Sequence, residues 1–197
     1  MEWGIKDFWD GMYDYQKYNL EVTKRVFLSQ LGFINVLVGG TYYHGSELPF
    51  PLLDISTGNQ TYWLQKKAYN LMNYMEFVSD KNVYAQFEYH MGGFVLNKIP
   101  LIKYLRFREV FSFKMLYGGL TQANDPNFNP NVYKLPLNDN GINTTYTFQN
   151  KIPYMEASVG LTNILRVIRV DLLWRLTYLQ HPNVAPVGFR VSAHFDF

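Results

Sequence analysis

Long runs of strict alternation between apolar and polar residues constrain the fold of this chain more than any other feature. The clearest run lies within residues 166–178. Its apolar positions are Ile168, Val170, Leu172, Trp174, Leu176 and Tyr178. The positions between them include Arg169, Asp171, Arg175 and Thr177. Because successive side chains of a strand point to opposite faces, this run predicts a β-strand with one apolar and one charged face.

The same period recurs along the chain, so the sequence predicts about seven strands. The other runs cover residues 17–28, 33–43, 82–91, 107–119, 154–161 and 187–197. Short turns alternate with two long connections, residues 44–81 and 120–153, and the first of these contains a candidate helical stretch at 65–73. Long strands with short turns at one end and long loops at the other are typical of transmembrane β-barrels. Strands of soluble sandwiches are usually shorter.

Composition narrows the alternatives. The chain of 197 residues is 48% hydrophobic, 18% aromatic and 17% charged, with a net charge of +2. That charge is too small to indicate a nucleic-acid partner. The absence of cysteine excludes disulfides and thiolate sites. Mean hydropathy is −0.18, and no apolar run of about 18 residues suits a helical membrane span.

The final run ends the chain with an aromatic residue. Its apolar positions are Phe189, Val191, Ala193, Phe195 and Phe197. A closing strand of this kind is found in bacterial outer-membrane barrels, so we expect these five residues to face lipid and to act as the signal for barrel assembly. Aromatic residues near strand ends are interpreted as an interfacial girdle. They include Tyr42, Tyr43, Tyr117, Tyr154, Trp174 and Tyr178.

Charged residues fall almost entirely on the polar faces of the expected strands. We expect a polar network in the barrel lumen, because a Lys or Arg facing the middle of the bilayer would cost about 2–4 kcal/mol. The expected members are Glu88, His90, Arg108, Lys114, Glu156, Arg169, Asp171, Arg175, Arg190 and Asp196. Lys24 and Glu109 are exceptions that fall on apolar faces. We expect these two to lie near an interface.

The sequence predicts no catalytic, cofactor-binding or metal-ligating residues. The four histidines are scattered, and Glu88 with His90 is interpreted as a hydrogen-bonded pair in preference to a metal site. Ser192 and His194 fall on the polar face, which does not suit a hydrolase of the barrel-phospholipase kind. No phosphate-binding glycine loop or dinucleotide signature occurs. A carbohydrate-binding role for the aromatic residues is a weaker alternative to the girdle.

Several longer motifs resemble a known family. They are Gly58-Asn59-Gln60-Thr61-Tyr62, Asn70-Leu71-Met72-Asn73-Tyr74, Glu88-Tyr89-His90-Met91-Gly92-Gly93, Pro153-Tyr154-Met155-Glu156 and His181-Pro182-Asn183. The chain resembles the C-terminal part of a Bacteroidetes outer-membrane family, in which a carboxypeptidase-regulatory-like domain precedes a barrel domain of unknown function. That barrel is more distantly similar to the BamA/TamA insertion superfamily of sixteen-stranded barrels.

The resemblance implies that residues 1–197 are the C-terminal portion of a longer, sixteen-stranded barrel, with loops 44–81 and 120–153 outside the cell. In the superfamily, a loop at the place of 44–81 folds back into the lumen through an Arg-Gly-aromatic motif. No Arg-Gly pair occurs in this loop, so no functional residue is carried over from that motif.

Three hypotheses for function follow. The first is a non-catalytic outer-membrane protein of the BamA/TamA type that inserts or translocates proteins. Its expected partners are outer-membrane lipid, the barrel-assembly machinery and other outer-membrane or exported proteins. The second is a receptor or channel-like barrel that binds an extracellular partner through its long loops. The third is a soluble β-barrel that binds a hydrophobic ligand, with its apolar faces pointing inward.

Overall fold

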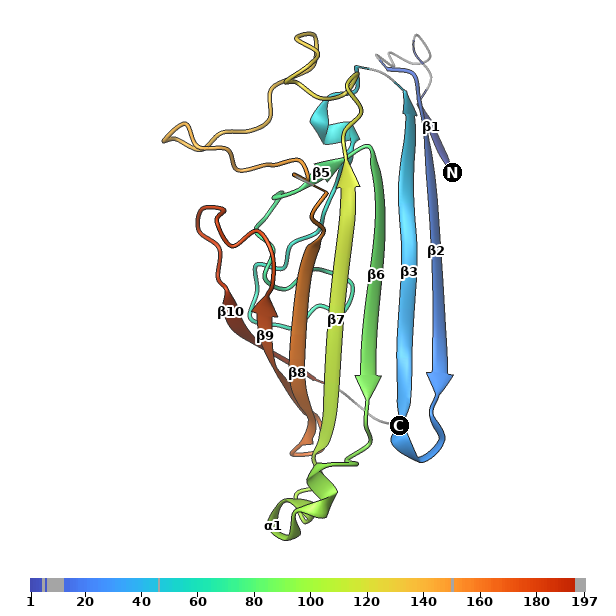
Figure 1. Ribbon diagram of the computed structural model, residues 1–197, viewed down its shortest axis with the longest axis vertical. Helices are drawn as coiled ribbons and strands as arrows, with labels where there is room; N and C mark the ends of the chain where they lie inside the picture. Colours follow the sequence, from blue (N-terminus) through green and yellow to red (C-terminus); the bar gives the residue numbers. More distant parts are fainter. Residues whose placement is uncertain (5, 7–12, 46, 150, 194–197) are drawn as a thin grey trace.

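The computed structural model describes residues 1–4, 6, 13–45, 47–149 and 151–193 (Figure 1). Within these residues, one antiparallel sheet of eight strands has the order β1-β2-β3-β6-β7-β8-β9-β10. The strands are β1 (Glu2–Gly4), β2 (Tyr15–Phe27), β3 (Phe33–Gly45), β6 (Lys81–His90), β7 (Arg108–Gly119), β8 (Tyr154–Ile164), β9 (Ile168–Arg175) and β10 (Val187–Ala193). A small second sheet pairs β4 (Asp54–Ile55) with β5 (Val78–Ser79).

Helical structure in the described residues is short. It consists of η1 (Ser29–Leu31), η2 (Phe50–Leu52), η3 (Leu96–Lys98) and α1 (Pro100–Lys103). The expected all-β, antiparallel class is therefore confirmed, and a strand forms in each of the seven alternating runs. The short strands β1, β4 and β5 lie outside the seven runs, and residues 65–73 form bends in place of the expected helical stretch. The sheet is open among the described residues, because its two edge strands, β1 and β10, do not pair with each other.

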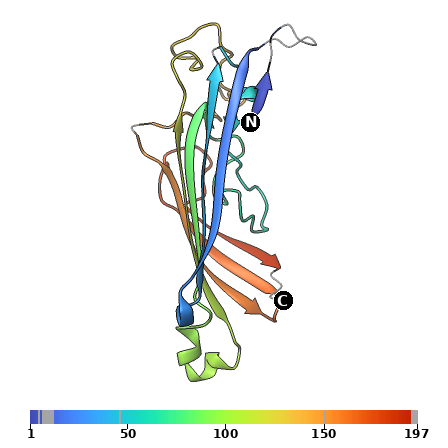
Figure 2. The same cartoon turned by 90° about the vertical axis from the view of Figure 1, so that its right-hand side faces the viewer.

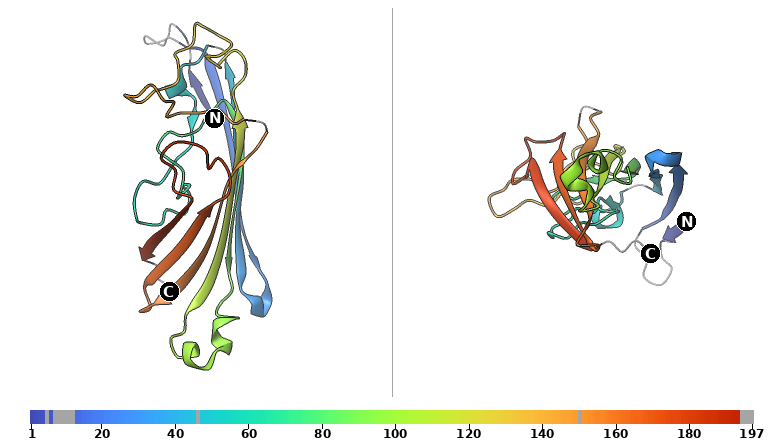
Figure 3. Two further views of the ribbon diagram at one scale, coloured as in Figure 1. Left: turned by 60° about the vertical axis from the view of Figure 1, so that its left-hand side comes forward. Right: turned by 90° about the horizontal axis from the view of Figure 1, so that it is seen from below.

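The sheet is curved, and its two faces have different surroundings. The connection from β3 to β6 turns back and lies on the inside of the curve, as the view along the strands shows (Figure 3). In the view of Figure 2, this connection lies on the side toward which β9 and β10 turn. We call residues 56–77 of this connection the inner loop. It covers the polar face of the sheet, whereas the opposite face carries the apolar positions.

That outward face is solvent-exposed and apolar along its length. Val22 is 58% exposed, Val83 50% and Leu172 45%, which are high fractions for aliphatic residues in a sheet. The same face exposes Val26, Val38, Phe87, Phe111, Val159 and Phe189. The exposed apolar residues therefore form a surface that extends across neighbouring strands of the sheet.

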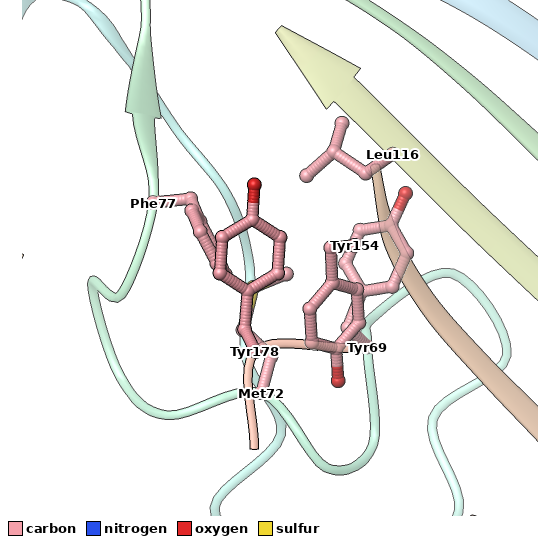
Figure 4. Close-up of a cluster of buried hydrophobic side chains, with 6 residues drawn as sticks. All are labelled: Tyr69, Met72, Phe77, Leu116, Tyr154 and Tyr178. Atoms are coloured by element: carbon pink, nitrogen blue, oxygen red, sulfur yellow. The ribbon is translucent and has the colours of Figure 1, made fainter. Parts of the chain in front are cut away.

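The core lies between the sheet and the inner loop, not between two sheets. Its largest cluster joins the loop to β7 and β8 (Figure 4). The members are Tyr69, Met72, Phe77, Leu116, Tyr154 and Tyr178. Phe77 is fully buried, and its ring lies 4.9 Å from that of Tyr178 at an angle of 70°. Edge-to-face pairs of this kind add to the stabilisation that apolar burial provides.

Three tyrosines that the sequence assigned to an interfacial girdle are in fact buried on the inner side. Tyr154 is fully buried and Tyr43 is 4% exposed, because both occupy positions on the loop-covered face. Tyr178 was expected at the end of an outward row, but β9 ends at Arg175. The chain then turns, with φ of 56° at Tyr178, and the Tyr178 hydroxyl donates to the carbonyl oxygen of Ile152 at 2.6 Å.

The free edge of β10 contacts the inner loop. Trp63 forms a parallel bridge with Val191. The N–H of Leu64 donates to the Val191 carbonyl at 2.8 Å, and the N–H of Val191 donates to the Tyr62 carbonyl at 2.9 Å. The rings of Tyr62 and Phe189 stack with centroids 6.1 Å apart. The loop therefore covers part of a strand edge that β9 leaves open.

Candidate functional site

The candidate site is the polar face of the sheet together with the inner loop that covers it. Alternation places most of the charged residues of β6 to β10 on this face, and the loop removes most of these from water. Buried charges require partners, because an unpaired charge in a low-dielectric interior is strongly disfavoured. The partners fall into three groups along the sheet.

The first group is centred on Arg169, which is 1% exposed. Its Nε and Nη2 donate to the two carboxylate oxygens of Asp171 at 2.6 and 2.8 Å, and its Nη1 donates to Glu88 at 2.8 Å. The other oxygen of Glu88 lies 2.7 Å from Nε2 of His90. Gly160 stands opposite Asp171, where a Cβ would come within 2.4 Å of an Asp171 oxygen. This group holds β6 and β9 together across the polar face.

The second group binds the backbone of the inner loop. Glu156 accepts the N–H of Asn70 at 2.9 Å through one oxygen, and the N–H of Leu71 at 3.1 Å through the other. Lys114 lies 3.9 Å from Glu156, and its Nζ donates to the carbonyl of Ala68 at 2.5 Å. The carboxylate thus satisfies loop donors while the ammonium satisfies a loop acceptor. The pair fixes the inner loop to the sheet with charge-assisted hydrogen bonds.

The third group joins Arg175 to the loop residue Glu76. Nη1 and Nη2 of Arg175 donate to the two Glu76 oxygens at 2.8 and 2.5 Å. Nδ1 of His181 lies 2.6 Å from the Glu76 oxygen that Nη2 contacts. Burial tends to raise the pKa of the Glu76 carboxyl, but the hydrogen bonds from Arg175 and His181 prevail and hold that pKa below its ordinary value. Glu76 is therefore a carboxylate at neutral pH.

Asn70 links the loop to itself and to the last strand. Its side-chain oxygen accepts the N–H of Gln65 at 3.1 Å and Nδ2 of Asn59 at 2.7 Å. Its own Nδ2 donates to the carbonyl oxygens of Gln65 and Ala68. Nη2 of Arg190 on β10 donates to the Asn70 carbonyl at 2.5 Å. A fully buried amide with these partners fixes the bends of the loop.

The structure thus brings together eight of the residues expected in the polar network. They are Glu88, His90, Lys114, Glu156, Arg169, Asp171, Arg175 and Arg190. Arg108 lies at the start of β7, where it is exposed. Asp196 lies outside the described residues.

The expected lipid-facing residues of the last strand are described only in part. Phe189 is 56% exposed on the outward face of β10, and Val191 and Ala193 share that face. Phe195 and Phe197 lie outside the described residues. The outward exception Glu109 has a specific role: although it is 6% exposed, one of its oxygens accepts the N–H groups of Val95 and Leu96 at 3.1 and 2.5 Å.

Sequence reasoning missed three residues of the site, Asn70, Glu76 and His181. None of them lies in an alternating run, so the period that predicted the strands says nothing about them. The signal that could have found two of them is the excess of cationic over acidic side chains on the polar face of β6 to β10. The sheet register sets Arg175 opposite Glu156 and Arg190 opposite Asp171. Glu156 binds the loop amides and Asp171 binds Arg169, so both guanidinium groups take partners from the loop.

A family model matches residues 1–124 and is described as the C-terminal domain of a family of unknown function, DUF5686. The match covers β1 to β7 and the whole inner loop. This chain belongs to that family. In this DUF5686 domain, the inner loop, Glu88 and Lys114 lie within the matched region, whereas Glu156, Arg169 and Arg175 follow it. The expected resemblance to the C-terminal part of a family of unknown function is thereby confirmed. No curated protein matches the chain.

The charged groups of this site are held by ion pairs with each other and by hydrogen bonds to the backbone of the inner loop. Across the described residues, no group of three or more His, Cys, Asp or Glu side chains is arranged to hold a metal ion. The same part of the chain contains no helix of the length and apolarity that a membrane-spanning helix needs. The arginine and carboxylate groups are directed at each other and at loop amides, so the arrangement positions a segment of polypeptide.

Proposed function

We propose that this chain forms part of the wall of an outer-membrane β-barrel of the BamA/TamA type, which acts without catalysis in the insertion or translocation of proteins. In this proposal the outward face lies in lipid and the inner loop lies in the lumen. The full barrel has about sixteen strands. The proposal also identifies the family of this chain with the Bacteroidetes outer-membrane proteins that carry a carboxypeptidase-regulatory-like domain.

The observation that carries the proposal is the contrast between the two faces. The outward face exposes Val22, Val83 and Leu172 to its surroundings, while Arg169 and Asp171 on the inner face are almost completely buried. A bilayer satisfies such an outward face, because lipid tails are as apolar as the side chains. The third hypothesis needs the apolar faces to point inward, and the curvature of this sheet argues against it.

The covered lumen supports the insertion or translocation role over an open pore. The inner loop is fixed by Glu156, Lys114 and Arg175, which come from three neighbouring strands. Opening a passage along this wall requires the loop to leave those partners. A polypeptide segment held by reversible ion pairs suits a barrel that changes state when it handles another chain.

A receptor role is the second candidate, and loop 120–153 favours it. Phe128 and Tyr133 are each 68% exposed on this loop, and Leu137 is 57% exposed. Exposed aromatic residues on a long loop are typical of binding surfaces. The inner loop is less available for this role, because most of its contacts are with the sheet.

Two measurements test the proposal. The full-length gene product is expected in the membrane fraction and to need detergent for extraction. Recovery in the aqueous phase without detergent would contradict the membrane placement. Depletion of the protein is expected to lower the amounts of other outer-membrane proteins. Unchanged amounts, together with loss of an extracellular binding activity, would favour the receptor.

A further inference from the structure

The connection between β6 and β7 differs from the other turns at the same end of the sheet. We call residues 94–106 the rim segment. It contains η3 and α1 and extends beyond the strand ends (Figure 1). The turns from β2 to β3 and from β8 to β9 are much shorter. An insertion of this kind at a tight-turn end calls for an explanation.

The rim segment is both apolar and basic. Tyr104 is 86% exposed and Leu105 is 55% exposed, and Phe94, Val95 and Ile99 are each more than 40% exposed. Its charged residues are Lys98, Lys103 and Arg106, and no Asp or Glu occurs from residue 91 to residue 108. Nζ of Lys98 lies 4.2 Å above the ring of Phe94. Exposed aromatic and aliphatic residues interleaved with cations are the composition of segments that lie in a membrane interface.

Two contacts fix the position of this segment. Glu109, on the outward face of β7, accepts the N–H groups of Val95 and Leu96. At the other end, Nδ2 of Asn163 donates to the carbonyl of Arg106 at 2.7 Å. Because Glu109 belongs to the outward face, it holds the beginning of the rim segment on the side of the sheet that carries Phe111 and Val159. The segment therefore continues the apolar outward surface at its end.

We propose that the rim segment binds the anionic headgroups of the membrane leaflet at the short-turn end of the sheet. This inference rests on the proposed function, since it takes the outward face to lie in lipid. Tyr104 and Leu105 enter the interface, and Lys98, Lys103 and Arg106 contact the headgroup phosphates. Each cation close to an anionic surface strengthens the association severalfold. A binding site for an acidic protein would not have to adjoin a lipid-facing surface, whereas the rim segment continues the outward apolar surface.

The absence of cysteine allows a direct test with single-cysteine variants of the full-length protein. A polarity-sensitive fluorophore is attached at Y104C, at L165C or at V159C. The protein is reconstituted in phosphatidylcholine vesicles with or without phosphatidylglycerol, and quenching by nitroxide-labelled lipid is measured. Leu165 is a matched control, because it is 80% exposed in the turn from β8 to β9 at the same end. Val159 reports on the outward face itself.

We expect the Tyr104 probe to be quenched at least about twofold more strongly than the Leu165 probe, and only when phosphatidylglycerol is present. The triple substitution K98Q/K103Q/R106Q should remove this difference. The inference would be overturned if both probes were quenched equally, or if quenching at Tyr104 did not depend on lipid charge. In either case a quenched Val159 probe would still support the membrane placement. An unquenched Val159 probe would overturn the proposed function and this inference with it.

Discussion

The carboxylate of Glu156 accepts the backbone N–H of Asn70 at 2.9 Å, although the two residues lie 86 positions apart in the chain. The other oxygen of the same carboxylate takes the N–H of Leu71. One side chain of β8 thus fixes two consecutive peptide groups of the inner loop. The position of the inner loop therefore depends on the chemical identity of the single side chain at position 156.

Glu156→Gln should release part of the inner loop. The amide group would direct an NH₂ donor at one of two backbone donors, which leaves a buried N–H without an acceptor at a cost of about 1–3 kcal/mol. We expect faster trypsin cleavage after Lys66 or Lys67 and a lower unfolding temperature. Asp139→Asn changes an exposed loop residue in the same way and should have no effect. Equal cleavage of both variants would contradict the role of Glu156.

Gly160→Ala should destabilise the sheet at the Arg169 group. The new Cβ would lie 2.4 Å from an oxygen of Asp171, and Arg169 holds that carboxylate in place. The expected cost is about 1–3 kcal/mol, measured as a shift in the denaturation midpoint. Gly119→Ala is the matched control, because a Cβ there meets nothing within 4 Å. Similar midpoints for both variants would show that Asp171 moves freely.

The Arg175 group should make the stability of the protein fall at acid pH. The folded pKa of Glu76 lies below the unfolded value of about 4.3, so its contribution is complete above that value and is lost as pH falls through the folded pKa. Glu76→Gln removes this titration. The difference in unfolding free energy between parent and variant should therefore be largest near neutral pH and shrink below about pH 4. A difference that is constant with pH would contradict the assignment.

The bridge between Trp63 and Val191 can be tested by cross-linking. Bridge partners in a sheet lie about 4.7–4.9 Å apart, which falls within the range that a disulfide spans. The double substitution W63C/V191C should therefore form a disulfide under mild oxidation, detected by its altered electrophoretic mobility. I168C/A193C, a paired position of β9 and β10, serves as a positive control. A cross-link in the control alone would show that the loop leaves the edge of β10.

The strands of this fold could be predicted from the sequence because their signal is local. Alternation in residues 166–178 assigned Arg169 and Asp171 to one face, and the structure places them there with bidentate contacts. The same reasoning placed the end of β9 too late. The chain turns at Arg175 because its guanidinium reaches the carbonyl oxygens of Thr177 and Tyr178, and no periodic pattern encodes these contacts.

The inner loop could not be predicted in this way. Residues 65–73 have a composition that permits a helix, yet the N–H groups of Asn70 and Leu71 bind Glu156. Their acceptor lies in a distant part of the chain, so the conformation depends on tertiary contacts. The hydrogen bonds of Glu109 could not be predicted for a similar reason. The sequence identified Glu109 as an exception to the alternation of β7, but its acceptor role depends on the N–H groups of Val95 and Leu96.

The strand order has a consequence for how this sheet can close. Among the described residues, neighbouring strands from β1 to β10 are all antiparallel and number eight, so the edge strands β1 and β10 run in opposite directions. Direct closure between these edges would make an antiparallel seam. An antiparallel cylinder that contains further strands needs an even number of them between β1 and β10. The parity of the sheet thus restricts which closed assemblies this wall can complete.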